Sequence, residues 1–268
     1  MKDQFAVTIL QSNLEWEDAA RNIETFESML NDHVKTTDLI VLPEMFTTGF
    51  TMNAESQAET MDGPTIQWMQ RTAKEMSSAI TGSLIIRDND HFFNRLIYAT
   101  KNGEIHQYDK RHLFSFAKED LHFKPGNSRL IVESEGWRIC PLVCYDLRFP
   151  VWSRNASLIG ENRVNEYDLL IYVANWPEAR RQPWINLLEA RAHENQSFVV
   201  GLNRVGVDGN GISYSGDSAI YSPKGERLIA PQPNQVAIET IVLEKKALDD
   251  FREKFPVGKD KDVFDIKK

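Results

Sequence analysis

The chain has 268 residues, of which 41% are hydrophobic and 26% are charged, proportions that are ordinary for a soluble globular protein. Its formal net charge of −8 argues against a surface made for nucleic acid or for anionic membranes. No apolar run reaches the about 18 residues of a transmembrane helix, so we expect no membrane-spanning segment.

The pattern continues without a linker or a low-complexity run, so residues 1–268 are expected to form a single domain. The N-terminal residues lead directly into a predicted strand, without the apolar segment of a secretory signal. The two cysteines, Cys140 and Cys144, do not have the number or spacing of a disulfide framework. A reduced, cytoplasmic setting is therefore the expectation.

The first half of the chain alternates strand-like and helix-like patterns. Apolar residues at helical spacing predict a helix over residues 17–33, and Pro64 begins a second helix over residues 64–77. The Lys-Asn-Gly sequence at residues 101–103 predicts a hairpin turn. Short runs rich in β-branched and aromatic residues predict strands at 5–10, 39–42, 79–87, 92–100 and 104–108.

The second half mixes further hairpins with strand–helix–strand units. Helices are predicted at residues 151–158, at 183–196 and after the last strand. Strands are predicted at 130–133, 137–143, 168–174, 198–203, 218–222, 226–229 and 236–243. This mixture indicates an α/β fold with mixed sheets, in which two sheets pack face to face under helices as a four-layer α-β-β-α sandwich.

Three polar residues lie where predicted apolar strands end: Glu44, Lys110 and Cys144. A carboxylate, an ammonium and a thiol in such positions can serve as base, cation and nucleophile. Because a thiol is only partly ionised near neutral pH, a catalytic cysteine needs a base or a nearby positive charge. Glu44 follows apolar residues that would desolvate it and is a better base candidate than any of the six histidines. Among these, His193 falls in an amphipathic helix and is expected to serve packing or the surface.

The sequences around these residues resemble the motifs of the nitrilase, or carbon–nitrogen hydrolase, superfamily. Leu-Pro-Glu-Met-Phe (42–46) is similar to the glutamate motif, Tyr-Asp-Lys-Arg-His-Leu-Phe (108–114) to the lysine motif, and Val-Cys-Tyr-Asp-Leu-Arg-Phe (143–149) to the cysteine motif. The resemblance covers nearly the whole chain. It implies a Glu–Lys–Cys triad in an amidohydrolase that works through a thioester, without a metal or an organic cofactor.

The superfamily carries a second active-site glutamate between the lysine and the cysteine. Glu119 lies ahead of the Lys-Pro-Gly turn at residues 124–126 and matches that place, with Asp120 as its rival. The resemblance implies that Glu119 orients Lys110 and the substrate. It also implies that Lys110 and the backbone N–H of Tyr145 hold the oxyanion.

Within the superfamily, Cys-Tyr-Asp-Leu-Arg-Phe (144–149) is most similar to the omega-amidase branch. This implies hydrolysis of the terminal amide of short dicarboxylate monoamides such as 2-oxoglutaramate. The second carboxylate of such a substrate suits an arginine, and Arg148 and Arg180 are the candidates. Arg148 could instead brace the turn behind the nucleophile, and Arg180 could be surface charge. Tyr145, Trp176 and Phe46 are expected to shape the pocket.

Three alternatives stay open at this point. The chain could hydrolyse N-carbamoyl amino acids or nitriles, as other members of the superfamily do, or be a non-catalytic interaction protein that keeps the scaffold. The partner expected from the resemblance is a small-molecule amide, and the expected assembly is a homodimer or a larger homo-oligomer. Cys140 is expected to be a small core residue.

Overall fold

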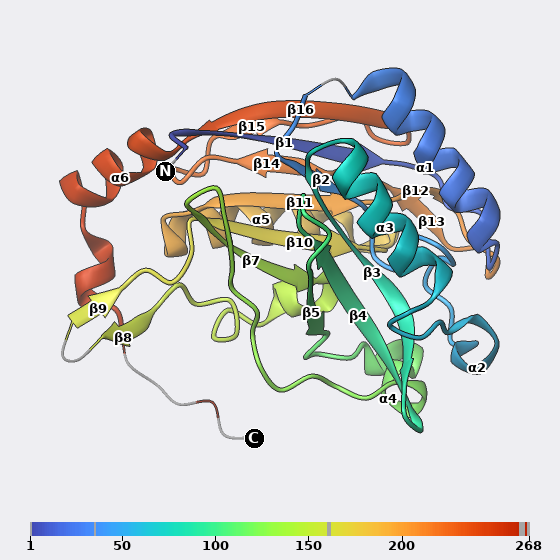
Figure 1. The fold of residues 1–268 in the computed structure, drawn as a ribbon. Coiled ribbons are helices and arrows are strands. Elements are labelled where there is room, and N and C mark those ends of the chain that lie inside the picture. Colours follow the sequence, from blue (N-terminus) through green and yellow to red (C-terminus); the bar gives the residue numbers. More distant parts are fainter. Residues whose placement is uncertain (1, 35, 160–161, 263–265, 267–268) are drawn as a thin grey trace.

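Two six-stranded mixed sheets form the centre of the molecule, which we describe from a computed structural model (Figure 1). The structure describes residues 2–34, 36–159, 162–262 and 266. The first sheet has the strand order β16-β1-β2-β3-β4-β5, with β1, β2 and β3 parallel to one another. The second has the order β15-β14-β11-β10-β7-β6, with β7, β10 and β11 parallel. The outer strands of both sheets pair antiparallel.

The strands of the first sheet are β1 (Gln4–Gln11), β2 (Leu39–Val41), β3 (Ala79–Asp88), β4 (His91–Ala99), β5 (Ile105–Asp109) and β16 (Ala237–Glu244). Those of the second sheet are β6 (Val132–Ser134), β7 (Trp137–Val143), β10 (Leu169–Ala174), β11 (Phe198–Asn203), β14 (Ala219–Tyr221) and β15 (Arg227–Ile229). Two small hairpins pair β8 (Ser157–Ile159) with β9 (Asn162–Val164) and β12 (Val205–Val207) with β13 (Ser213–Ser215).

The helices are α1 (Ala19–His33), α2 (Ala54–Gln57), α3 (Pro64–Glu75), α4 (Glu119–His122), α5 (Arg181–Asn195) and α6 (Lys245–Lys254). Short 3-10 helices span Ser115–Ala117, Cys144–Arg148, Glu178–Arg180 and Val257–Asp260. Figure 1 shows α1 and α3 over the first sheet, with α5 behind the second.

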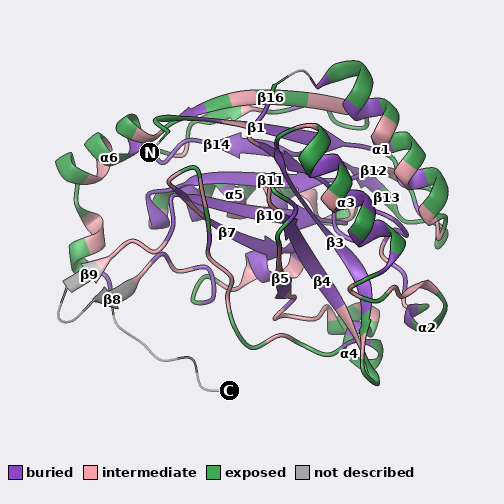
Figure 2. Ribbon diagram, in the orientation of Figure 1, coloured by how far each residue is buried: buried purple, intermediate pink, exposed green. Residues whose placement is uncertain are grey.

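The two faces of the first sheet belong to different cores because side chains alternate along a strand. Val41 faces the cluster shared with the second sheet, whereas its neighbour Ile40 packs with Phe26 of α1 and Trp68 of α3. On the outer face of the second sheet, α5 approaches β11 closely. A Cβ at Gly201 of β11 would lie 2.3 Å from Leu188 Cδ1 of α5. The central strands are accordingly buried, while the strands β15 and β16 and the outward faces of the helices are more exposed (Figure 2).

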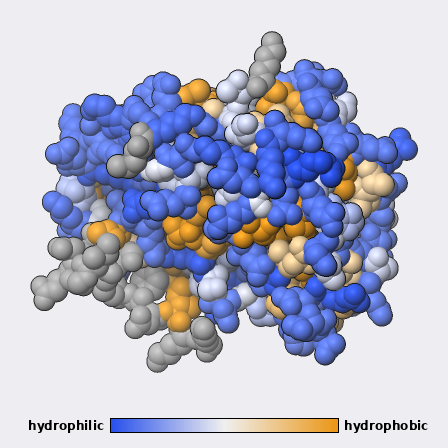
Figure 3. Space-filling view, in the orientation of Figure 1, coloured by the Kyte–Doolittle hydropathy of each residue, from blue (hydrophilic) through white to orange (hydrophobic). Residues whose placement is uncertain are grey.

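The polarity of the molecular surface is consistent with apolar side chains being buried between these layers. The face shown in Figure 3 is mostly hydrophilic, with apolar side chains gathered across its middle. None of the helices in the described ranges combines the length and apolar character that crossing a membrane requires.

The predicted α/β sandwich of two mixed sheets is confirmed, and most predicted elements are present with ends shifted by up to two residues. The helix predicted over residues 151–158 is wrong. Buried polar contacts determine this segment instead: Trp152 Nε1 donates to the Tyr108 hydroxyl at 2.9 Å, and Asn155 Nδ2 donates to the Asn195 carbonyl at 3.1 Å. Residues beyond them form β8.

Candidate active site

Four side chains meet near the ends of strands from both sheets. Glu44 follows β2, Lys110 follows β5, and Cys144 follows β7 of the other sheet, while Glu119 begins α4. Lys110 Nζ lies 2.9 Å from Glu44 Oε1 and 3.0 and 2.9 Å from the two oxygens of Glu119. Glu44 and Glu119 are fully buried, and Cys144 is 9% exposed. The structure thus brings together the four residues that the sequence predicted as catalytic.

The choice between Glu119 and Asp120 follows from burial. Asp120 is exposed to solvent, whereas Glu119 also accepts a hydrogen bond from the Phe114 backbone N–H at 2.6 Å. Of these two residues, Glu119 is therefore the one that faces Lys110.

The backbone around Lys110 is held by a close approach of the Lys-Pro-Gly turn. Gly126 N–H donates to the Lys110 carbonyl at 3.0 Å. A Cβ at Gly126 would lie 2.1 Å from the Asp109 carbonyl oxygen, so a side chain there would push the turn away. Glycine at this position lets the turn fix the main chain that carries the lysine.

Cys144 sits on a sharp turn between β7 and the 3-10 helix Cys144–Arg148. Its φ of 43° lies in the left-handed region, which is uncommon for a residue with a side chain. The buried carboxylate of Asp146 supports the turn by accepting from Val143 N–H at 3.1 Å and from the Tyr108 hydroxyl at 2.8 Å. It also accepts from His112 N–H at 3.0 Å. Asp146 therefore links the chain after Lys110 to the turn that carries the thiol.

The electrostatics of the cluster keep the lysine charged and the thiol neutral. Burial by itself lowers the pKa of Lys110, but the carboxylates of Glu119 and Glu44 outweigh it and the pKa is raised overall. Burial, and next the charge of Glu44, raises the pKa of the Cys144 thiol well above its ordinary value. Burial likewise raises the pKa of Glu119, although the Lys110 charge opposes this. In the free protein the thiol is therefore protonated and needs a base before it can attack.

Two asparagines that the sequence reasoning missed hold Glu44. The Asn175 backbone N–H donates to Glu44 Oε2 at 2.8 Å, and the Asn94 side chain donates to Glu44 Oε1 at 2.8 Å. Asn175 directly follows β10, the same strand-end signal that singled out Glu44, and could have been found from it. Asn94 interrupts the apolar strand β4, which is a weaker signal.

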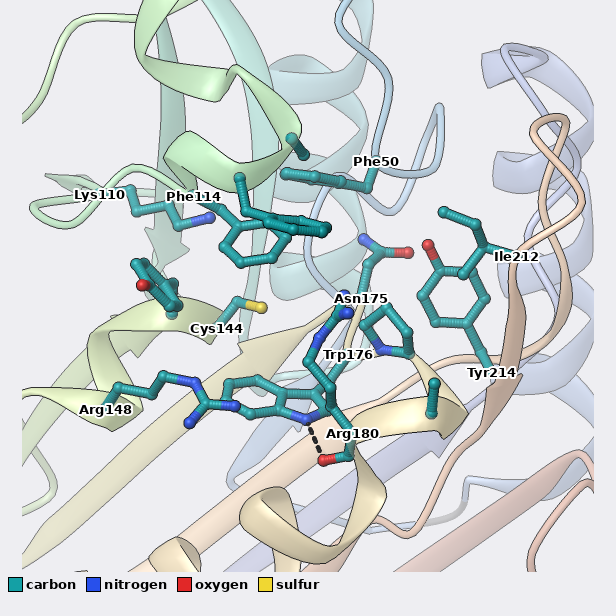
Figure 4. Close-up of a pocket in the computed structure, with 15 residues that line it drawn as sticks. Phe50, Lys110, Phe114, Cys144, Arg148, Asn175, Trp176, Arg180, Ile212 and Tyr214 are labelled. Atoms are coloured by element: carbon teal, nitrogen blue, oxygen red, sulfur yellow. Dashed lines mark hydrogen bonds between the residues drawn. The ribbon is translucent and has the colours of Figure 1, made fainter.

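A cavity of about 410 Å³ opens over Cys144. Figure 4 shows the Cys144 thiol and the Lys110 ammonium pointing into the same space. The described residues that line it are Phe50, Lys110, Phe114, Phe116, Ala117, Cys144, Tyr145, Arg148, Asn175, Trp176, Pro177, Ala179, Arg180, Ile212 and Tyr214. Six of these fifteen residues are aromatic, and the set contains three cationic side chains and no Asp or Glu. The pocket therefore favours an anionic ligand with a short apolar body.

The two candidate arginines lie on aromatic rings of this wall. The Arg148 guanidinium is 4.8 Å from the centre of the Trp176 ring, and that of Arg180 is 5.2 Å from the centre of the Phe114 ring (Figure 4). Asp146 supports the turn behind Cys144 through its own hydrogen bonds, and a structural role for Arg148 beside it stays an alternative to carboxylate binding. Arg181, the neighbour of Arg180, pairs with Asp217 instead.

Tyr145 and Trp176 line the pocket, but the prediction that Phe46 shapes it is wrong. Phe46 is fully buried in the core under α1 and α3, with its ring edge-on to Phe26. It packs over β3, where a Cβ at Gly82 would lie 2.8 Å from its ring. The cause is the turn at Met45, whose positive φ of 42° directs the chain back towards β3. Phe50 takes the place in the pocket wall.

The remaining sequence candidates lie elsewhere. Cys140 is fully buried in the hydrophobic core, and His193 is an exposed residue of α5 beside Glu189. Within the described residues, no group of three or more His, Cys, Asp or Glu side chains is arranged to hold a metal ion.

The sequence and the fold of this chain are similar to those of known proteins. The family model described as "Carbon-nitrogen hydrolase" matches residues 6–247. The chain is 46% identical over 258 residues to "Omega-amidase YafV" of Escherichia coli (strain K12), covering 96% of this chain and 97% of that protein. It is 32% identical over 266 residues to "2-oxoglutaramate amidase" of Bacillus subtilis (strain 168), covering 97% and 100%.

Among solved structures, the chain is similar to XC1258 from Xanthomonas campestris, described as a CN-hydrolase superfamily protein with an arsenic adduct in the active site. The TM-score is 0.96 at 42% sequence identity, and the match covers 99% of this chain and all of the other.

Proposed function

The chain belongs to the carbon–nitrogen hydrolase family, and from that premise we propose that it removes the terminal amide of short dicarboxylate monoamides, as an omega-amidase. It is a hydrolase that acts on carbon–nitrogen bonds other than peptide bonds. One observation carries the choice of substrate: Arg148 and Arg180 line the pocket over Cys144, and no acidic side chain does so among the described residues. A substrate such as 2-oxoglutaramate would present its amide to the thiol and its carboxylate to the arginines.

In the proposed acylation, Glu44 accepts the thiol proton of Cys144 and the sulfur attacks the amide carbon. As the sulfur–carbon bond forms, the carbonyl oxygen gains negative charge, which the Lys110 ammonium and the Tyr145 N–H stabilise. The Tyr145 N–H lies near the start of a short helix, where amides have no partner within the helix. The carbon–nitrogen bond then breaks, Glu44 returns the proton to the nitrogen, and ammonia leaves a thioester on Cys144.

In the proposed deacylation, Glu44 takes a proton from water and the oxygen adds to the thioester carbon. The carbon–sulfur bond breaks, the carboxylic acid leaves, and the sulfur recovers its proton from Glu44. Lys110 remains charged while Glu44 carries the proton because the Glu119 carboxylate still contacts it. Glu119 holds this ammonium towards the pocket and would help to orient the substrate amide.

The experiment that tests this function is ammonia release from a panel of compounds. The panel contains 2-oxoglutaramate, succinamate, glutaramate, an N-carbamoyl amino acid and a simple nitrile, with Cys144→Ala as the inactive control. We expect turnover of the monoamides. Turnover confined to the nitrile or to the carbamoyl compound would instead assign the chain to another branch of the family. No turnover of any compound, together with stable capture of a macromolecule, would favour a non-catalytic role.

We also propose that the protein works in the reducing cytoplasm as a homodimer or a larger homo-oligomer. Its cysteines Cys140 and Cys144 are both free thiols, and the proposed chemistry requires a reduced Cys144. Light scattering coupled to gel filtration measures the assembly, and a monomer would contradict the second part of this proposal.

A further inference from the structure

Asn94 contacts both carboxylates of the site without reaching the pocket. It lies in β4, is fully buried, and is absent from the residues that line the cavity. Its Nδ2 lies 2.8 Å from Glu44 Oε1 and 3.1 Å from Glu119 Oε1. Since Asn94 does not meet the substrate, any effect on the reaction must pass through these two side chains.

The direction in which the Asn94 amide faces follows from a chain of donors. The Met45 backbone N–H can only donate, and it donates to Ser83 Oγ at 2.9 Å. Ser83 in turn lies 2.8 Å from Asn94 Oδ1, to which its hydroxyl donates. The amide oxygen of Asn94 is thereby occupied, and both hydrogens of its nitrogen are left for the carboxylates. The chain begins at the residue after Glu44 and returns to the Glu44 side chain, closing a ring.

The two oxygens of Glu44 accept different numbers of hydrogen bonds as a result. Oε1 accepts from Lys110 at 2.9 Å and from Asn94 at 2.8 Å, which occupies both of its lone pairs. Among the described residues, the nitrogen donor to Oε2 is the Asn175 N–H, at 2.8 Å. One lone pair of Oε2 is therefore open to a further donor.

We propose that Asn94, oriented by Ser83, is a positioning residue that reserves Oε2 of Glu44 for the thiol proton of Cys144. This inference rests on the proposed function, in which Glu44 is the base. The neutral amide suits the task because the cluster already holds two carboxylates against one ammonium. A cation in its place would compete with Lys110, and an acid would add a third carboxyl group without donors.

The test measures the reactivity of Cys144 separately from the identity of the amide substrate. Iodoacetamide alkylates the sulfur as iodide leaves and Glu44 takes the proton, so its rate reports activation of the thiol. The variants are Asn94→Leu and Asn94→Asp, with Ser83→Ala as a milder change that keeps the proposal testable if the Asn94 variants fail to fold. The matched control is Asn22→Leu, which replaces another buried asparagine, one whose side chain donates to the Glu15 and Thr47 carbonyls and not to Glu44 or Glu119.

We expect both Asn94 variants to slow alkylation and kcat by about 10- to 100-fold, the range for one hydrogen bond to a charged group, with KM changed less than about twofold. Ser83→Ala should give a smaller change of the same kind, and Asn22→Leu none beyond its effect on folding.

Two results would overturn the proposal. If the alkylation rate and kcat of the Asn94 variants stay within about twofold of the parent while Glu44→Gln is slow, the positioning role fails and the base survives. If Glu44→Gln is alkylated as fast as the parent, the proposed base fails and this inference fails with it.

Discussion

The two arginines of the pocket allow a sharp test of substrate recognition. Replacing Arg148 or Arg180 by Met keeps an unbranched side chain of similar reach and removes the guanidinium. If these groups bind the distal carboxylate, the loss should depend on whether the substrate has one. The informative pair is glutaramate and pentanamide, which share the scissile amide and differ by a carboxylate in place of a methyl group.

The size of the effect follows from where the guanidinium groups lie. Both are partly exposed and lie on aromatic rings at 4.8 and 5.2 Å, with no acidic side chain among the described residues of the pocket wall. A hydrogen bond to a charged group contributes about 1.5 to 3 kcal/mol, and partial exposure favours the lower end. Since each 1.4 kcal/mol is about tenfold, each single variant should lose about 10-fold in kcat/KM for glutaramate. The double variant should lose less than the product because both groups share one carboxylate.

The assay is kcat/KM from initial rates of ammonia release. We expect pentanamide to turn over more slowly than glutaramate, and its kcat/KM should change by less than about twofold in either variant. Arg181→Met is the matched control, since Arg181 is the next residue in the chain and pairs with Asp217 outside the pocket. Equal losses for glutaramate and pentanamide would refute carboxylate recognition, because they would show that the arginines only support the pocket wall.

Three further outcomes follow from the structure. Glu119→Gln should lower kcat by at least about 100-fold, since it removes a buried charge that contacts Lys110. Asp120→Asn should leave kcat within about twofold of the parent. Equal effects of the two substitutions in the ammonia assay would contradict the assignment of Glu119. Ultraviolet difference spectra of the parent against Cys144→Ala should show no thiolate until well above pH about 8.5, because burial raises the pKa of Cys144; a step near neutral pH would contradict this. Burial opposes ionisation of Asp168, but Lys245, Arg252 and Arg138 outweigh it and lower the pKa of this carboxyl to about 2 from an ordinary 3.8. Asp168→Asn should therefore lower the free energy of unfolding, measured in urea, by about 2 kcal/mol. This stability is present above pH about 4 and is lost as the pH falls towards 2, so a variant as acid-sensitive as the parent would contradict it.

Much of the site could be predicted because strand ends are readable in a sequence. Glu44, Lys110 and Cys144 each follow an apolar run, and the layered fold brings those strand ends to one place. Asn175 lies at such an end too and was missed only because an asparagine there carries no chemistry by itself. The paired arginines could be named as candidates, but their positions on Trp176 and Phe114 required the structure.

The failures come from backbone turns and buried polar contacts, which residue patterns do not reveal. Phe46 follows Glu44 so closely that a place in the pocket was expected, yet the positive φ of Met45 sends its ring into the core. The helix expected over residues 151–158 had suitable apolar spacing, but the contacts of Trp152 and Asn155 overrule it. Asn94 acts through an orientation set by Ser83, eleven residues earlier on the neighbouring strand, and no local pattern contains that information.

The central claim is that Cys144 captures the acyl group of a dicarboxylate monoamide, and acid quenching during turnover tests it most directly. Protein mixed with 2-oxoglutaramate or glutaramate is quenched within the first turnovers, digested at low pH and examined by mass spectrometry. We predict one acyl group per chain, attached to the peptide at Cys144, with one equivalent of ammonia released as it forms. Ammonia released without any adduct on Cys144, or an adduct on Cys140 instead, would contradict the account.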